Sequence, residues 1–122
     1  GIQMGTRFVS SQESPVHENF KGAIVNGSEQ GTYLLNKKSK PCIRALKTEF
    51  TEKIYEDGQM DMSALGGIKD LYFGGNMNAA PALAGQSIGL ISEVLPVERI
   101  IKQTMEEFNS VCDSLSNSKF EL

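Results

Sequence analysis

The tripeptide Gly5-Thr6-Arg7 combines residue types that suit a phosphate group. A glycine has no side chain, so its backbone can approach an anion closely. The threonine adds a hydroxyl and a backbone N–H that can both donate to phosphate oxygens. A glycine at the end of a strand is more often only a turn former, so the tripeptide alone leaves both roles open.

Three other polar side chains are candidates for binding or for structure. His17 could line a pocket or bind substrate, but a lone histidine at a helix start more often makes local hydrogen bonds, which we favour. For Lys21, solvation of a helix face is favoured over a phosphate contact. Arg44 is expected to form an ion pair.

Gly85 and Gln86 begin a segment in which small residues allow close approach of backbone or ligand. The Gln86 amide can donate and accept hydrogen bonds. Close packing and contact with a ligand are equally acceptable roles for the pair. Three methionines in a glycine-rich segment could line a lid, although gap filling is their more frequent role: Met60, Met62 and Met77.

The two cysteines predict neither a metal site nor a disulfide framework. Cys42 and Cys112 lie too far apart in sequence for a zinc knuckle and are too few for a secreted, disulfide-rich domain. A reducing cytoplasm is therefore the expected compartment. Cys112 falls on the apolar stripe of an expected helix, which predicts a buried, inert thiol.

The length of 122 residues fits one small domain or a piece of a larger one. Twelve Lys and Arg against fifteen Asp and Glu give a net charge of −3, which argues against a broad surface for nucleic acid. No apolar run reaches the roughly 18–20 residues of a membrane-spanning helix. We therefore expect a globular protein with neither a nucleic-acid nor a membrane partner.

The first half of the chain predicts a strand followed by two helices. Apolar residues alternate with polar ones over residues 2–8, which is typical of a short strand. Ser14 as cap and Pro15 at the first helical position predict a helix over residues 15–25. Residues 26–41 are expected to be mostly loop, although residues 32–35 could form a brief strand. The spacing of apolar residues predicts a second helix over residues 42–55, ended by Gly58.

The second half is loose and then strongly helical. Paired glycines bracket residues 68–73, which predicts one or two helical turns beside a hinge or lid. A helix opens at Pro96, and we expect Glu98 to pair with Lys102. It carries a continuous apolar stripe that must pack on something: Val97, Ile100, Ile101, Met105, Phe108, Val111, Cys112 and Leu115. Residues 117–122 are expected to fray.

Three blocks, read in order, resemble the C-terminal part of the nitronate monooxygenase family, formerly called 2-nitropropane dioxygenases. This family is similar to the flavin-dependent enoyl-acyl-carrier-protein reductases. The octapeptide that opens the chain is the most specific of the blocks, which read Gly1-Ile2-Gln3-Met4-Gly5-Thr6-Arg7-Phe8, then Glu13-Ser14 with His17-Glu18-Asn19-Phe20-Lys21, and finally Ala84-Gly85-Gln86-Ser87-Ile88-Gly89-Leu90.

The resemblance implies an α/β fold, the C-terminal part of a TIM-type (β/α)8 barrel that binds FMN. A complete barrel takes about 250 residues, so the chain would supply about half of it. The division implied is a last barrel strand and phosphate loop at residues 1–12, a helical lid or insertion at 13–78, and C-terminal helices packing on the barrel at 79–122. The segment itself would be mostly helical, with one barrel strand at its N-terminus.

The resemblance also implies where the cofactor lies. It places the flavin at Gln3, Met4, Gly5 and Thr6, with Gly85 and Gln86 as further candidates. The family's catalytic histidine belongs to an earlier part of the barrel, so we expect no catalytic residue in this chain. Within this family, Arg44 would join the lid to the barrel through its ion pair.

The resemblance implies an oxidoreductase, in which a flavoprotein oxidises alkyl nitronates with oxygen. The chain alone would be inactive, and its partners would be a small-molecule substrate and the remainder of the barrel, with homo-oligomerisation left open. One alternative is a flavin-dependent enoyl-acyl-carrier-protein reductase. The other is a non-catalytic helical interaction module that binds a partner through its last helix.

Overall fold

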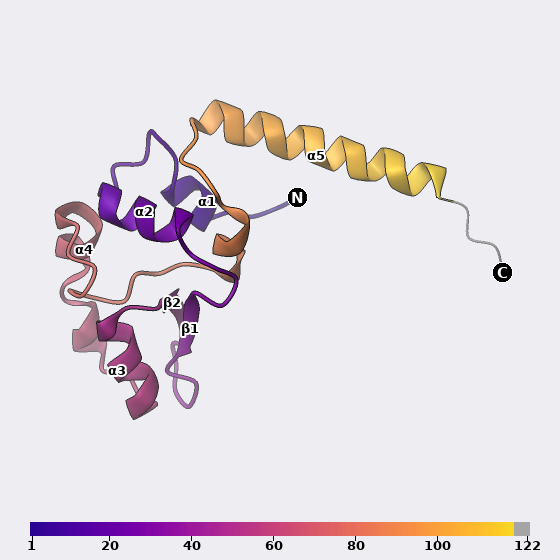
Figure 1. The fold of residues 1–122 in the computed structure, drawn as a ribbon. Helices are drawn as coiled ribbons and strands as arrows, with labels where there is room; N and C mark the ends of the chain where they lie inside the picture. The colour runs from indigo at the N-terminus through magenta and orange to yellow at the C-terminus, as the bar shows by residue number, and fades with distance from the viewer. Residues whose placement is uncertain (119–122) are drawn as a thin grey trace.

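The computed structural model describes residues 1–118 and combines helices with one small sheet (Figure 1). The fraying expected at residues 117–122 falls mostly outside these residues. The elements, in chain order, are α1 (Thr6–Val9), α2 (Glu18–Val25), β1 (Thr32–Leu35), β2 (Ile43–Leu46), α3 (Glu49–Asp57), the 3-10 helix η1 (Met62–Leu65), α4 (Ile68–Gly74), the 3-10 helix η2 (Gln86–Leu90) and α5 (Val97–Asn117).

The opening segment differs from the expected strand. Thr6–Val9 is a short helix, because the N–H groups of Phe8 and Val9 both donate to the carbonyl of Gly5, at 3.0 and 3.1 Å. The prediction of a strand through Phe8 is therefore wrong. Residues 1–4 have no strand partner among the described residues. Alternating apolar and polar residues form a stable strand only when neighbouring strands pair with them.

Helix α2 begins three residues later than predicted and ends at Val25 as predicted. His17 is its cap, because the imidazole Nδ1 accepts a hydrogen bond from the N–H of Asn19 at 3.1 Å. The hydroxyl of Ser14 instead accepts from the N–H of Val16, at 3.4 Å. His17 therefore caps the helix in place of Ser14, which the sequence had suggested as the cap.

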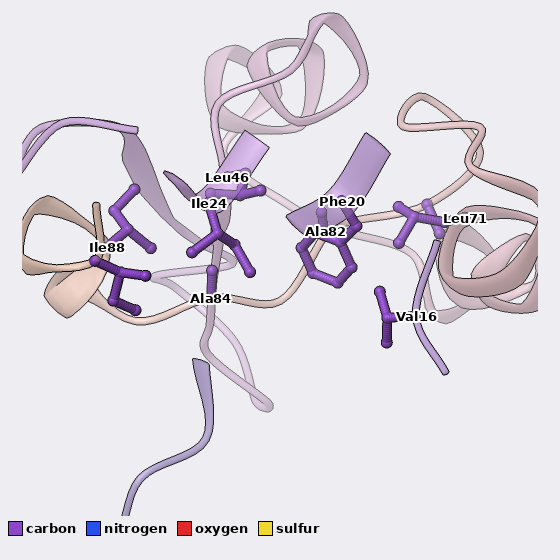
Figure 2. Close-up of a cluster of buried hydrophobic side chains, with 10 residues drawn as sticks. Val16, Phe20, Ile24, Leu46, Leu71, Ala82, Ala84 and Ile88 are labelled. Carbon is purple, nitrogen blue, oxygen red and sulfur yellow. The ribbon is translucent and has the colours of Figure 1, made fainter. Parts of the chain in front are cut away.

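The hydrophobic core lies between α2, α4, η2 and the segment before η2 (Figure 2). Phe20 and Ile24 of α2 are fully buried, as are Leu71 of α4 and Ile88 of η2. Phe20 meets the ring of Tyr72 edge to face, with the ring centroids 5.1 Å apart. Burial of each such side chain contributes roughly 1.5–3 kcal/mol to the free energy of folding. This cluster therefore holds η2 and the segment before it against α2.

The predicted helix over residues 42–55 is wrong in its first part. Ile43–Leu46 is strand β2, which pairs antiparallel with β1 so that Thr32 faces Leu46 and Leu35 faces Ile43. Leu46 also donates from its N–H to the carbonyl of Ala82, at 2.8 Å. The brief strand considered for residues 32–35 is confirmed as β1, so residues 26–41 are not all loop.

Helix α3 starts at Glu49 because Thr48 and Thr51 form a reciprocal capping box. Each threonine hydroxyl accepts from the backbone N–H of the other, at 3.2 and 2.9 Å. Gly58 follows in the left-handed conformation, with φ of 73°, and ends the helix as predicted. The sequence therefore predicted the end of α3 correctly and placed its start too early.

The glycine-bracketed segment forms η1 and α4, which confirms the predicted turns at residues 68–73. Gly67 lies so close to the backbone of Ala79 that an added Cβ would overlap the Ala79 carbonyl. Gly75 ends α4 in the left-handed conformation, with φ of 76°. Both glycines are therefore required by close approach or by backbone conformation.

Helix α5 starts at Val97, directly after Pro96, as predicted, and extends away from the rest of the described chain (Figure 1). Its apolar stripe is largely uncovered among the described residues, because only Ile100 is buried. Cys112 is exposed, so the prediction of a buried thiol is wrong. The predicted pair of Glu98 with Lys102 is also not formed, since Lys102 lies 4.0 Å from Glu106.

The described helices include none that is both long and apolar enough to cross a membrane.

Candidate functional site

A cavity of about 530 Å³ lies between the opening segment, η2 and the first turns of α5. Its size falls in the range of small-molecule sites, roughly 300–1,000 Å³. Five of the six residues expected at the cofactor contribute to its wall, namely Gln3, Met4, Gly5, Thr6 and Gly85. Gln86 does not line it. The structure thus brings two segments about eighty residues apart to one site.

The contact between these segments is a hydrogen bond. The backbone N–H of Gly85 donates to Thr6 Oγ1 at 2.9 Å. Among the described residues, none accepts the proton of the Thr6 hydroxyl. A hydroxyl has one proton and two lone pairs, so Thr6 can hold the Gly85 loop and still donate to a ligand in the cavity.

Gly5 faces open space at the same cavity. A Cβ built on Gly5 would meet no atom within 4 Å outside its chain neighbours. Packing inside the described chain therefore does not require a glycine here, and neither does its backbone, since φ is −105°. The bare backbone of Gly5 is therefore open to close approach by a ligand from the cavity.

The side chain of Arg7 has a structural contact. Its Nη1 donates to the carbonyl of Glu93 at 2.8 Å, which fixes the segment between η2 and α5 next to α1. The parallel bridge between Ser11 and Leu95 continues this contact. Arg7 therefore shapes the cavity by joining two of its walls.

His17 and Lys21 lie outside the cavity. His17 makes local hydrogen bonds, as favoured from the sequence, because it caps α2. Lys21 is 9% exposed, and its ammonium donates to the carbonyls of Ser14 and Gln12, at 2.8 and 3.4 Å. The prediction that Lys21 solvates a helix face is therefore wrong, because two backbone carbonyls supply the partners that its buried charge needs.

Within the part of the chain that the structure describes, the expected ion pair of Arg44 is not present. Its Nη1 donates to the hydroxyl of Thr32, at 3.0 Å, between neighbouring strands of the hairpin. The single ion pair among residues 1–118 is the exposed one in α5. Arg44 therefore stabilises the hairpin itself, because its closest partner is a cross-strand neighbour.

The sequence did not identify the helical wall of the cavity. Gln103 and Glu107 of α5 line it, and Gln103 Nε2 donates to Glu107 Oε1 at 3.1 Å. Their four-residue spacing places them on one helix face, but nothing in the sequence says that this face meets residues 3–7. The contact between this helix face and residues 3–7 arises only from the tertiary structure.

The resolved pKa shifts lie away from the cavity. Burial raises the pKa of the Tyr72 phenol, which packs on Phe20. Hydrogen bonds from the backbone and side chain of Ser63 lower the pKa of the Asp61 carboxyl at the start of η1. Neither group belongs to the cavity wall, whose charged lining residues are Arg7, Glu93 and Glu107.

Residues 1–107 match the family model described as nitronate monooxygenase. The match covers most of the chain and includes both segments of the cavity, and the chain therefore belongs to the nitronate monooxygenase family. A relative described as a probable nitronate monooxygenase, from Staphylococcus saprophyticus, is 29% identical over 119 residues. The alignment covers 89% of this chain and 34% of that relative.

Two solved structures have a similar fold, FabK from Thermotoga maritima and a mutant of the same protein. Both are 34% identical to this chain and cover 95% of it, with TM-scores of 0.85 and 0.81. The chain covers 39% and 36% of them, so it spans little more than a third of these relatives. The expected fold class is confirmed: the chain is part of an α/β protein of the TIM-type (β/α)8 barrel kind. Its own described elements are mainly helices with a two-stranded sheet, and the barrel strand expected at its N-terminus is not among them.

Proposed function

We propose that this chain supplies the flavin-phosphate wall of an FMN-dependent nitronate monooxygenase. One observation carries the proposal: five of the six residues expected at the cofactor line a single cavity, in a chain that matches the nitronate monooxygenase family. The division into residues 1–12, 13–78 and 79–122 stays part of this proposal, with the middle segment as the lid or insertion.

The residues of the cavity would bind and orient the phosphate end of FMN, and FMN would supply the electron chemistry. Gly5 would allow its backbone to approach the phosphate, and the Thr6 hydroxyl would donate to a phosphate oxygen. Gln3 and Met4 would line the side of the cofactor, and Gly85 would hold Thr6 in place. For Gln86, a contact with FMN would require the loop to turn it toward the cavity.

The whole protein would oxidise an alkyl nitronate with oxygen, giving a carbonyl compound and nitrite. We assign no catalytic residue to this chain, since its only histidine caps α2 and lies outside the cavity wall. The remainder of the barrel would cover the exposed apolar face of α5 and supply the substrate pocket. The cytoplasm is the proposed compartment, in keeping with the free thiols of Cys42 and Cys112.

A second candidate function is reduction of an enoyl thioester by flavin. The observation that favours it is the likeness to FabK of Thermotoga maritima, with a TM-score of 0.85. Both candidates use the same phosphate wall, so the choice between them depends on residues that contact the substrate. Nitrite release from an alkyl nitronate, measured against enoyl thioester reduction, separates the two.

The phosphate wall is tested by Gly5→Val in the full-length protein that carries this segment. A branched side chain would fill the space that the anion needs, so we expect the purified variant to lose its flavin absorbance. Thr6→Ala should weaken FMN binding about ten- to a hundredfold, the typical effect of losing a hydrogen bond to a charged group.

Gly22→Val is the matched control, because a Cβ at Gly22 also meets open space and Gly22 does not line the cavity. This variant should retain flavin. A folded Gly5→Val protein with the same flavin content as Gly22→Val would contradict the proposal.

A further inference from the structure

We infer that Thr6 is a positioning residue that couples phosphate binding to the loop at Gly85. The inference rests on the proposed function. It concerns the contact between Thr6 and Gly85, which phosphate binding does not itself require. Its basis is the hydrogen bond from the Gly85 N–H to Thr6 Oγ1, at 2.9 Å, across the wall of the cavity.

The backbone of Thr6 is hydrogen-bonded within the first turn of the chain's opening helix. Its carbonyl accepts from the N–H of Ser10, at 3.2 Å, and from the Ser10 hydroxyl, at 3.3 Å. Ser10 is fully buried. The Thr6 side chain therefore projects from a backbone that two hydrogen bonds hold in place.

The other end of the bond is connected to the core. The carbonyl of Gly85 accepts from the N–H of Ile88, at 3.4 Å, and Ile88 is fully buried against α2. The preceding residue, Ala84, donates to the carbonyl of Arg44 in β2. The Gly85 loop is thus supported from the core side, and Thr6 supports it from the cavity side.

Polarisation of the Thr6 hydroxyl would strengthen its hydrogen bond with the Gly85 N–H when a ligand binds. When a hydroxyl donates its proton to an anion, its oxygen becomes a better acceptor, and consecutive hydrogen bonds strengthen one another by roughly 10–30%. A phosphate that accepts from Thr6 would therefore tighten the bond from Gly85. The segment at Gly85, together with Gln86 and Ser87 at the start of η2, would become more ordered as the cofactor binds.

The experiment measures amide hydrogen exchange by NMR in the flavin-free form of the full-length protein that carries this segment. Thr6→Val keeps the shape of the side chain and removes the hydroxyl, so the Gly85 amide should exchange about fivefold faster. Thr6→Ser keeps the hydroxyl and should restore protection. A merely space-filling role for Thr6 predicts the reverse order of the two variants.

FMN and riboflavin are the two probes, since they differ only in the phosphate. FMN should slow exchange at Gly85 in the unmodified protein and in Thr6→Ser, and should have no such effect in Thr6→Val. Riboflavin should leave exchange at Gly85 unchanged in all three proteins.

Two results would overturn the inference, and they are distinguishable. If FMN shifts the amide signals of residues 5–7 without slowing exchange at Gly85, the coupling is wrong and the phosphate site stands. If FMN perturbs neither segment, the proposed phosphate wall is wrong and the coupling falls with it.

Discussion

The imidazole of His17 packs so closely against Gly75 that a Cβ on Gly75 would overlap the ring at Nδ1. Two hydrogen bonds strengthen this contact between the start of α2 and the end of α4. The N–H of His17 donates to the carbonyl of Tyr72 at 2.7 Å, and Asn19 Nδ2 donates to the carbonyl of Gly75 at 2.9 Å. The cap of one helix is thus built on the end of another.

We expect Gly75→Ala to destabilise the chain by about 2 kcal/mol or more. The left-handed conformation of Gly75, with φ of 76°, costs a non-glycine residue roughly 1–2 kcal/mol, and displacement of His17 adds to this. Urea unfolding measures the change. Gly58→Ala is the control, because Gly58 has a similar φ of 73° but open space at its Cβ. Equal losses in the two variants would contradict the role of His17.

Thr51→Val should destabilise the chain by about 1–3 kcal/mol, because it leaves buried polar groups without partners. The fully buried Thr51 hydroxyl donates to the carbonyl of Leu46 at 2.7 Å and accepts from the N–H of Thr48 at 2.9 Å. Thr104→Val is the matched control, since that hydroxyl donates only to a carbonyl within its own helix. Thermal unfolding compares them, and a Thr51 variant as stable as the control would refute the argument.

Lys21→Met should cost about 1.5–3 kcal/mol, the value typical of a hydrogen bond to a charged group. Methionine keeps an unbranched apolar stem and removes the ammonium, which leaves the carbonyls of Ser14 and Gln12 without their donor. The loop between α1 and α2 should then exchange its amides faster. Lys69→Met, at an exposed position of α4, should have little effect on either measurement. Indistinguishable variants would show that Lys21 only solvates its helix.

The chain by itself should show no turnover of an alkyl nitronate. It spans little more than a third of its structural relatives, and its only histidine lies outside the cavity wall. Addition of FMN supplies the flavin ring without the rest of its pocket. Nitrite release from the chain with FMN is therefore expected to equal that from free FMN. A rate clearly above free FMN would place the catalytic groups within these residues.

The sequence predicted helix boundaries where a proline, a glycine or an apolar stripe marks them locally. The start of α5 follows from Pro96 and its stripe, and the end of α3 follows from Gly58. Strand β2 was missed because Ile43 and Leu46 also fit a helical spacing, and a four-residue run cannot separate the two periods. The bond from Leu46 to Ala82 decided the outcome, and such long-range contacts are not encoded locally.

The sequence predicted the cavity wall formed by residues near Thr6 and Gly85 and missed the wall formed by α5. The residues near Thr6 and Gly85 were found through the blocks that resemble the family, and the structure joins them by one hydrogen bond. Gln103 and Glu107 carry no motif, because their place in the wall depends on the angle at which α5 leaves the chain. That angle is a property of the whole fold.

We expect most of helix α5 to unfold separately from the rest of the chain. At 21 residues it is about 31 Å long, yet Ile100, in its first turn, is its only buried residue among those described. A single helix of this length is only marginally stable in water, so its outer turns gain almost nothing from the core around Phe20. Heating should therefore remove much of the helical circular dichroism gradually, before the core unfolds in a cooperative step. The melting temperature of the core and the midpoint of helix loss are then separate properties of one chain.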